Sequence, residues 1–333
     1  MDKDISAKAC LSDNTRYADL INGLLLQGRQ IVRAEDLHEA DTQTVDVGST
    51  MERETDARSR SEKRKKKKRE LRRDLHKKVA FGVNFVVIGV ENQSEVHYTE
   101  PLRVMSYDAA EYQRQTRNIE RSVRSAKGVS KAEFLSGFRK NDKLLPCITI
   151  VLYYGEAWDG SRDLHGLLDF TDVPEELKAY INNYQAHIFS IKKMDNTDVF
   201  RTDLKQIFDF IRYAEDKKKL RELVENDPLY KNMDEDAYDM VVACTGTKEL
   251  LEIKKYHGKD GKIDMCKGLY DWIEEERMEG KSEGMREGMR AFVEDYLEEG
   301  REPEVIAEKL VRRFGLSYEE AQEYVSDRLA SMA

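Results

Sequence analysis

The sequence lacks the long apolar runs that membrane proteins need. Its longest apolar stretches, around residues 85–90 and 148–154, are far shorter than the roughly 20 residues that cross a bilayer as a helix. The first residues are too polar for a secretory signal. We therefore expect a cytoplasmic protein with no membrane partner.

Cysteine and histidine are also scarce, and neither is spaced for metal binding. The four cysteines lie far apart and include no Cys-x-x-Cys pair, which suits reduced thiols in a cytosol. The six histidines are scattered and show no zinc-ligand spacing. A zinc site and a disulfide framework are both disfavoured.

Charge, by contrast, is abundant and unevenly distributed. Charged residues make up 36% of the 333 residues, and the net charge is -9. The segment from Arg60 to Lys78 nevertheless holds twelve Lys and Arg residues against three acids, a local charge of +9. A solvated, partly disordered charge run would explain this segment, and so would an arm that binds an anionic polymer. Because the segment leads into a candidate site, we keep DNA as a partner.

Periodicity predicts an α/β protein that is rich in helix beyond residue 200. Apolar runs predict strands at 30–37, 85–93, 147–155 and 186–191, and residues 14–27 read as a helix. Another helix is expected to open at Thr99-Glu-Pro, and its predicted buried stripe is Leu102, Met105, Ala109 and Tyr112. A helical stripe at Leu204, Ile207, Phe208, Ile211 and Tyr213 follows.

The expected organisation has five segments. They are 1–47 (first helix and strand of the core), 48–70 (basic linker, exposed helix or arm), 71–200 (main core), 201–263 (helical extension) and 264–333 (charged helical tail). In the tail, the glycines at 280, 284 and 288 indicate close packing or flexibility, because each weakens a helix by roughly 1 kcal/mol. Two short helices around Gly315 favour a helical hairpin over a DNA-binding helix-turn-helix. The tail is also a candidate surface for homo-oligomer formation.

The strand at 85–93 ends in polar residues on a face that is otherwise apolar. With a two-residue period, Glu91 and Gln93 share the face of Phe85 and Val87. Burying a carboxylate there is costly unless it coordinates a partner. Asp74 lies seventeen residues earlier, which fits a second acid on a hairpin partner.

Two carboxylates would suffice to hold Mg²⁺, which prefers oxygen ligands and keeps several waters. The carbonyl of Asn92 is a third candidate ligand, and the Gln93 amide would orient the attacking water. An acidic pair that faces solvent, with Gln93 as ordinary surface, explains the same spacing. On spacing alone that second interpretation is favoured.

Two sequence blocks resemble the recombination-promoting nuclease (Rpn) family, which is often labelled transposase-like. In IGVENQSEVHYTEPLRVMSYDAAEY the family pattern falls on Glu91, Gln93, Ser94, Arg103 and Tyr107. In LLPCITIVLYYGEAWDGSRDLHGLLDF it falls on Pro146, Tyr153, Gly155 and Trp158. The acidic pattern also looks like the PD-(D/E)XK nuclease core, with Gln93 in the place of the lysine. The resemblance covers most of residues 15–255.

The resemblance implies a PD-(D/E)XK-like core, a mixed sheet flanked by helices, with Mg²⁺-dependent DNA endonuclease activity linked to recombination. It places the metal on Asp74 and Glu91, with Gln93 beside them and Mn²⁺ as a substitute ion. Arg103 and Tyr107, one helical turn apart, would reach a phosphate or form a structural pair with each other. Asp19 is a weaker additional acid.

Two departures from the family pattern matter. Glutamine supplies no charge to stabilise the phosphorane oxygens, so catalysis is expected to be slow. The basic insertion before Asp74 would add phosphate contacts, and Arg72, Arg73 and Lys77 are the candidate phosphate-binding residues around Asp74. The alternative functions are an inactive nuclease-fold module that binds DNA or a protein partner, and a scaffold that pairs through its charged tail.

Overall fold

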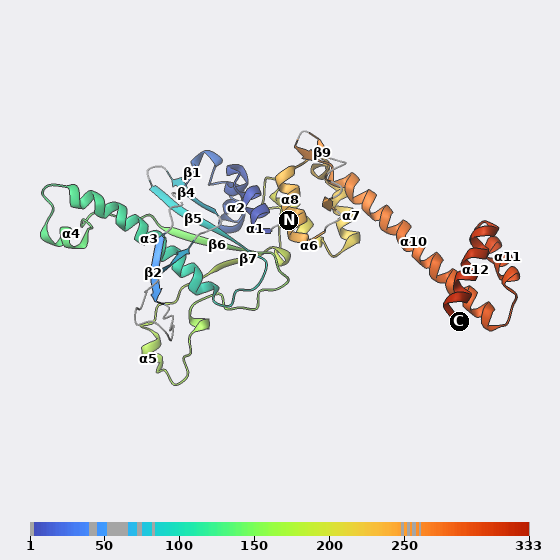
Figure 1. Cartoon of the computed structure of the whole chain (residues 1–333). Helices are drawn as coiled ribbons and strands as arrows, with labels where there is room; N and C mark the ends of the chain where they lie inside the picture. Colours follow the sequence, from blue (N-terminus) through green and yellow to red (C-terminus); the bar gives the residue numbers. More distant parts are fainter. Residues whose placement is uncertain are drawn as a thin grey trace. The chain divides into compact units, whose positions relative to one another are not determined.

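The computed structural model describes residues 3–39, 45–51, 66–71, 75–81, 84–247, 250–251, 254, 258–259 and 261–332 (Figure 1). The chain divides into two compact units, Met1–Met265 and Cys266–Ala333, and each is described by itself. Asp74, Arg72 and Arg73 lie outside the described residues. Their predicted roles therefore stay predictions.

The first unit is an α/β structure built on a mixed five-stranded sheet, in the order β1-β4-β5-β6-β7. The strands are β1 (Leu37–Glu39), β4 (Leu75–Phe81), β5 (Asn84–Gln93), β6 (Cys147–Tyr153) and β7 (His187–Ser190). β4 pairs antiparallel with β1 and β5, whereas β5, β6 and β7 run parallel. The prediction of an α/β fold with a central mixed sheet is confirmed.

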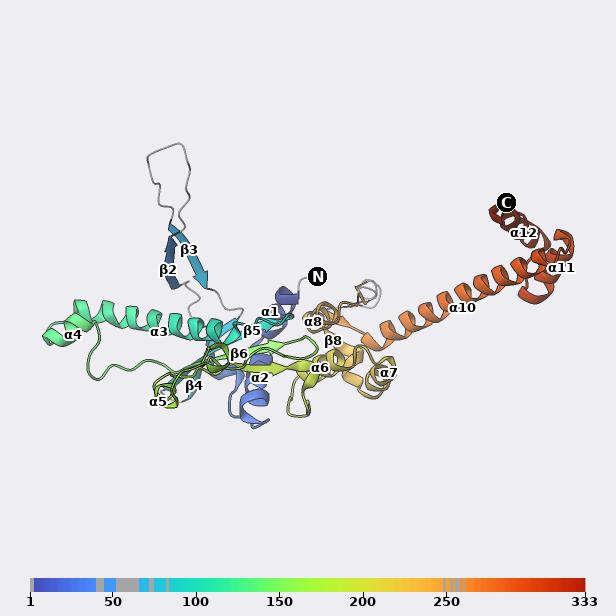
Figure 2. The same cartoon turned by 90° about the horizontal axis from the view of Figure 1, so that it is seen from below.

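Helices cover both faces of this sheet. α1 (Lys3–Leu11) and α2 (Asn14–Leu26) lie on one face, where the Tyr17 hydroxyl donates to the carbonyl of Ile88 at 2.7 Å. α3 (Glu100–Ser125) lies on the other face, where Val104 packs against Val151 (Figures 1 and 2). Successive β5 residues thus point to opposite helical layers.

The rest of the first unit consists of short elements. They are η1 (Ala34–Asp36), β2 (Val45–Met51), β3 (Lys66–Leu71), α4 (Lys131–Ser136), η2 (His165–Leu167), α5 (Glu175–Lys178), η3 (Ile191–Lys193), α6 (Leu204–Tyr213), α7 (Lys217–Asn226), η4 (Pro228–Asn232), β8 (Met233–Asp234), α8 (Glu235–Thr245), β9 (Gly258–Lys259) and β10 (Lys262–Ile263). The apolar stripe of α6 is buried as predicted from Leu204 to Ile211, and Tyr213 at its end is half-buried.

Two predicted elements differ from the structure. The predicted strand at 30–37 is irregular backbone and a 3-10 turn, with β1 beginning only at Leu37. The Asn22 side chain accepts from the backbone N–H groups of Ile31 and Val32 and donates to the carbonyl of Val32, so this backbone is satisfied without a sheet. In the segment 48–70, expected as a linker or exposed helix, residues 48–51 and 66–70 are strands of the β2–β3 pair beside α3 (Figure 2).

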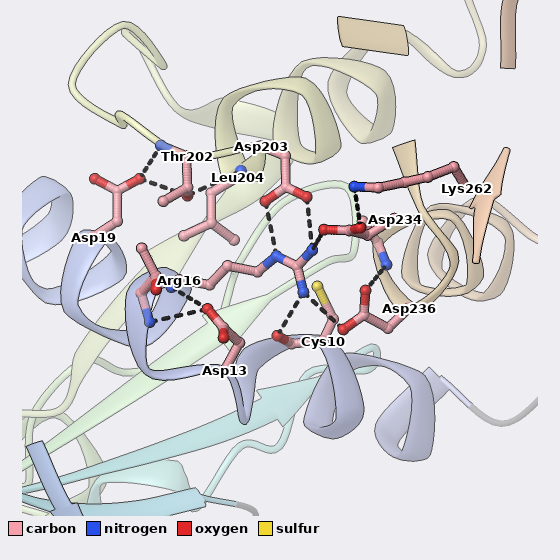
Figure 3. A network of polar contacts seen from close by, with 12 residues as sticks. Cys10, Asp13, Arg16, Asp19, Thr202, Asp203, Leu204, Asp234, Asp236 and Lys262 are labelled. Carbon is pink, nitrogen blue, oxygen red and sulfur yellow. Dashed lines mark hydrogen bonds and ion pairs between the residues drawn. The ribbon is translucent and has the colours of Figure 1, made fainter. Parts of the chain in front are cut away.

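A buried arginine joins the first helices to the later part of the unit (Figure 3). Arg16 on α2 donates twice to Asp203, at 2.8 Å each, and once each to Asp234 and Asp236, at 2.9 and 2.7 Å. It also contacts the carbonyl of Cys10 at 3.4 Å. Burial alone would lower the pKa of Arg16, but these bonds raise it. Each guanidinium nitrogen has an acceptor, so this network is closed.

The second unit consists of helices. α10 (Met265–Glu298) leads into α11 (Pro303–Phe314) and α12 (Tyr318–Met332), whose apolar residues pack together. Gly315 ends α11 with a φ of 73°, and the two helices contact each other as a hairpin. A Cβ at Gly280 or Gly284 would meet nothing within 4 Å, so close packing does not explain those glycines. None of the helices in the described residues combines the length and apolarity that crossing a membrane requires.

Candidate functional site

The candidate site lies where β5 ends, on the sheet face that α3 covers. Glu91 pairs with Val151 of β6 and is 1% exposed. Its neighbours on this face are α3 side chains, because Val151 also packs against Val104. In sheets with parallel strands, ligands commonly bind at the carboxyl ends of the strands. The predicted burial of Glu91 on one face of the strand agrees with this position.

One guanidinium lies against two buried carboxylates at this position. Arg103 Nη2 is 3.4 Å from Glu91 Oε2, and Nη1 is 3.5 Å from Glu100 Oε2. Glu100 is fully buried, and neither of its oxygens has a hydrogen-bond partner among the described residues. His97 Nδ1 lies 3.6 Å from the same oxygen. Arg103 thus forms only long ion-pair contacts with both carboxylates, and its side chain remains 29% exposed.

Arg103 and Tyr107 form the pair that their spacing on α3 predicted. Arg103 Nε donates to the Tyr107 hydroxyl at 3.1 Å, and the guanidinium carbon is 5.6 Å from the ring centre. This contact holds the guanidinium over the end of β5. The two side chains therefore form the structural pair with each other that was one of the two expectations. Arg103 nevertheless remains 29% exposed.

Burial governs the protonation of the site. It raises the pKa of Glu100, although the charges of Arg103 and His97 oppose the shift. Burial and the charge of Glu91 raise the pKa of Tyr107 to about 12, so its hydroxyl stays protonated at neutral pH. Burial alone would lower the pKa of Arg103, but Tyr107 and the two carboxylates raise it. The site holds a fixed positive charge beside Glu100, a carboxylate whose ionisation is costly.

Further along α3, two more buried acids have closed contacts. Asp108 accepts from the Thr149 hydroxyl at 2.6 Å and also from the Tyr184 hydroxyl. Glu111 accepts from Arg114 through both oxygens, at 2.8 and 2.7 Å. Burial would raise the pKa of Glu111, but the bonds from Arg114 lower it. These acids are bound into the fold, unlike Glu100.

The predicted buried stripe of α3 was wrong. Leu102 is 45% exposed, Ala109 is exposed, and Met105 and Tyr112 are only half-buried. The side chains on the sheet are instead mostly polar, with Glu100, Tyr107, Asp108, Glu111 and Gln115 among them. Sequence reasoning missed Glu100 because its position before Pro101 suggested a role at the helix N-terminus. The spacing of 100, 104, 107, 108 and 111 was the available signal.

The other predicted site residues are divided between the two faces. Gln93 lies on the Glu91 face and is half-exposed. The Asn92 side chain lies on the opposite face and accepts from the Tyr154 hydroxyl at 2.9 Å. Lys77 also lies there, 2% exposed, and its ammonium donates to the carbonyl of Ser12 and the side chain of Asn14. Neither Asn92 nor Lys77 extends a side chain toward Glu91.

Asp19, the additional acid, serves the fold. Its carboxylate accepts from the backbone N–H groups of Arg201 and Thr202 and from the Thr202 hydroxyl. It is 3% exposed and positions the loop that leads into α6. Asp19 is therefore separate from the Glu91 site.

The carboxylates of the site are ligands of the type that a hard divalent cation prefers. Glu91 and Glu100 supply oxygen atoms, which Mg²⁺ and Mn²⁺ accept readily, and the buried oxygens of Glu100 lack donors within the described ranges. In those same ranges, no three His, Cys, Asp or Glu side chains are grouped as a metal site would require. Two carboxylates and water is therefore the donor set that these residues offer.

Comparison of the chain with family models, with curated proteins and with solved structures gives no match in any of the three. The resemblance to the Rpn family thus depends on the sequence blocks alone and stays a prediction.

Proposed function

We propose that this chain is a divalent-metal-dependent DNA endonuclease that hydrolyses phosphodiester bonds at the Glu91 site. The observation that carries the proposal is the buried pair Glu91 and Glu100 around the partly exposed guanidinium of Arg103. Two carboxylates beside one fixed cation suit a reaction that must bind a metal and stabilise an anionic phosphate. The resemblance to the Rpn family supports the same chemistry and a role in recombination.

Each residue of the site has a separate task in this proposal. Glu91 holds the metal together with either Asp74 or Glu100. The role of Asp74 is predicted from the sequence alone. A bound divalent cation would supply charge neutralisation and a hydroxide near neutral pH. Arg103 contacts the phosphate through its exposed edge, and Tyr107 orients the guanidinium. Gln93, half-exposed on the same face, orients the attacking water.

Plasmid nicking tests the proposal directly. Supercoiled plasmid is incubated with wild type, Asp74→Asn or Glu91→Gln in Mg²⁺, Mn²⁺ or EDTA. We expect nicking with either metal, none in EDTA, and a loss of at least about 100-fold in both variants. Glu95→Gln is the matched control, because Glu95 is exposed and follows Gln93 by two residues. Equal nicking by wild type and Glu91→Gln would refute the site.

Metal-independent DNA binding is the second candidate. It is favoured by the position of Arg103, which already offsets charge on both carboxylates without an added ion. In this case the basic side chains of the Arg60–Lys78 segment other than Lys77, which is buried, bind phosphates and nothing is cleaved. With about six phosphate contacts, a plot of the logarithm of the DNA-binding constant against the logarithm of salt concentration, measured in EDTA, should have a slope of about -5. A flat salt response would remove DNA as a partner.

A further inference from the structure

A polar pocket lies at the carboxyl ends of β6 and β7. It has a volume of about 430 Å³ and is lined by Trp158, Arg162, Ser190 and Lys193, among others. Ser190 pairs with Tyr153, which pairs with Gln93. Paired residues of parallel strands share a face, so Ser190 lies on the Glu91 face, two strand spacings or roughly 10 Å from Gln93.

Two of the lining residues each carry a polar atom without the partner that buried groups normally have. Trp158 Nε1 and Ser190 Oγ are buried and form no hydrogen bond with any described residue. Buried polar atoms nearly always have a partner, and an indole N–H can only donate. The Trp158 ring is held edge-on against Tyr153, with the ring centres 5.2 Å apart. The missing partner of Trp158 must therefore be an acceptor.

The charge of the pocket favours an anionic acceptor. Arg162 donates to the carbonyl of Ile188 at 2.7 Å, and within the described part of the chain neither Arg162 nor Lys193 has an ion pair. Lys192, one residue earlier, is paired with Glu156 and Glu215. Asp195 is the acid among the pocket residues. Two basic side chains thus line the pocket with one carboxylate, together with the two residues whose donors lack a partner.

We propose that this pocket binds a phosphate group, and that in the nuclease it holds a neighbouring phosphate of the strand that is cut at Glu91. The second part rests on the proposed function, whereas the first does not. A phosphate has oxygens on all sides, so it accepts from two cations and from further donors at once. Phosphate contacts of this kind fix the position of a strand without reading its sequence.

Indole resonances provide a direct test with the full-length protein. The chain has two tryptophans, Trp158 and Trp272, so its ¹H–¹⁵N spectrum contains two indole signals, and Trp158→Phe assigns them. Titration with inorganic phosphate should shift the Trp158 signal to saturation and leave the Trp272 signal in place. Ser190→Ala and Lys193→Met should each weaken binding by about ten-fold. Lys192→Met is the matched control and should bind like wild type.

A short 5′-phosphorylated oligothymidylate then separates free phosphate from a nucleic acid strand. With this substrate and Mg²⁺, Lys193→Met should raise KM by about ten-fold and leave kcat nearly unchanged, as expected for a contact that is equal in ground and transition states. Phosphate binding without any cleavage would support the phosphate pocket and refute the proposed nuclease activity. Three results would refute phosphate binding in the pocket. They are cleavage without a shift of the Trp158 signal, an equal shift with acetate, and equal losses of phosphate affinity in Lys192→Met and Lys193→Met.

Discussion

Two arginines of the first unit each face more than one acid, and they differ in how completely they are bonded. Arg16 is 7% exposed, and its guanidinium forms short bonds to three aspartates. Arg103 is 29% exposed and approaches its two carboxylates only to 3.4 and 3.5 Å. A closed set of bonds fixes a fold, whereas loosely held charges remain able to bind something else. We therefore propose a structural role for Arg16 and a functional role for Arg103.

Removing Arg16 should have the largest effect on stability. Arg16→Met leaves Asp203, Asp234 and Asp236 facing one another without their shared cation. We expect the free energy of unfolding to fall by about 3 kcal/mol, near the lower end for a broken buried pair because two of the acids are partly exposed. Urea denaturation measures this loss. Arg16→Lys should not restore stability, because lysine cannot reproduce the forked bonds to Asp203.

Removing Arg103 should affect activity more than stability. We expect Arg103→Met to lose about 100-fold in nicking rate and only about 1–2 kcal/mol in the free energy of unfolding. Added Mg²⁺ should restore part of that stability, because the ion compensates Glu91 and Glu100 in place of the guanidinium. If Arg103→Met proved less stable than Arg16→Met and lost no activity, the assignment of the two arginines would be reversed.

Glu100 should give the smallest effect, one that depends on pH. Its pKa is raised in the folded state, so between the ordinary carboxyl value and the raised value the folded protein binds more protons than the unfolded chain. Stability then falls as pH rises through this window and levels off above the folded pKa. Glu100→Gln lacks this contribution, so it should gain on wild type as pH rises. Denaturation in EDTA from pH 4 to 8 measures the difference, and parallel curves would contradict it.

The sequence predicted elements whose pattern is long and apolar. β5, β6, β7 and the stripe of α6 belong to this class, because burial on one face requires a regular period. The strand expected at 30–37 failed because Asn22, distant from any strand pattern, satisfies the backbone of Ile31 and Val32. No propensity reports such a tertiary contact.

The site was only half predictable for a related reason. Glu91 was found because a carboxylate on an apolar strand face stands out, and the Arg103–Tyr107 pair was found from its helical spacing. Glu100 and Asp108 were missed because hydrophobicity marks apolar cores, and this one is polar. Buried Asp108 accepts from Thr149, on the later strand β6, and from Tyr184, in a later loop. Those donors become neighbours of α3 only after folding.

The parallel pairing of β5 with β6 also bears on how the molecule matures. Glu91 is enclosed only when β5 meets Val151 and α3 settles on that pair, and these partners are distant in sequence. Contacts of such long separation form slowly, after local helices. A newly synthesised chain would therefore pass through an interval in which its helices exist while the acidic end of β5 still faces water, and the proposed site would be among the last parts of the unit to form.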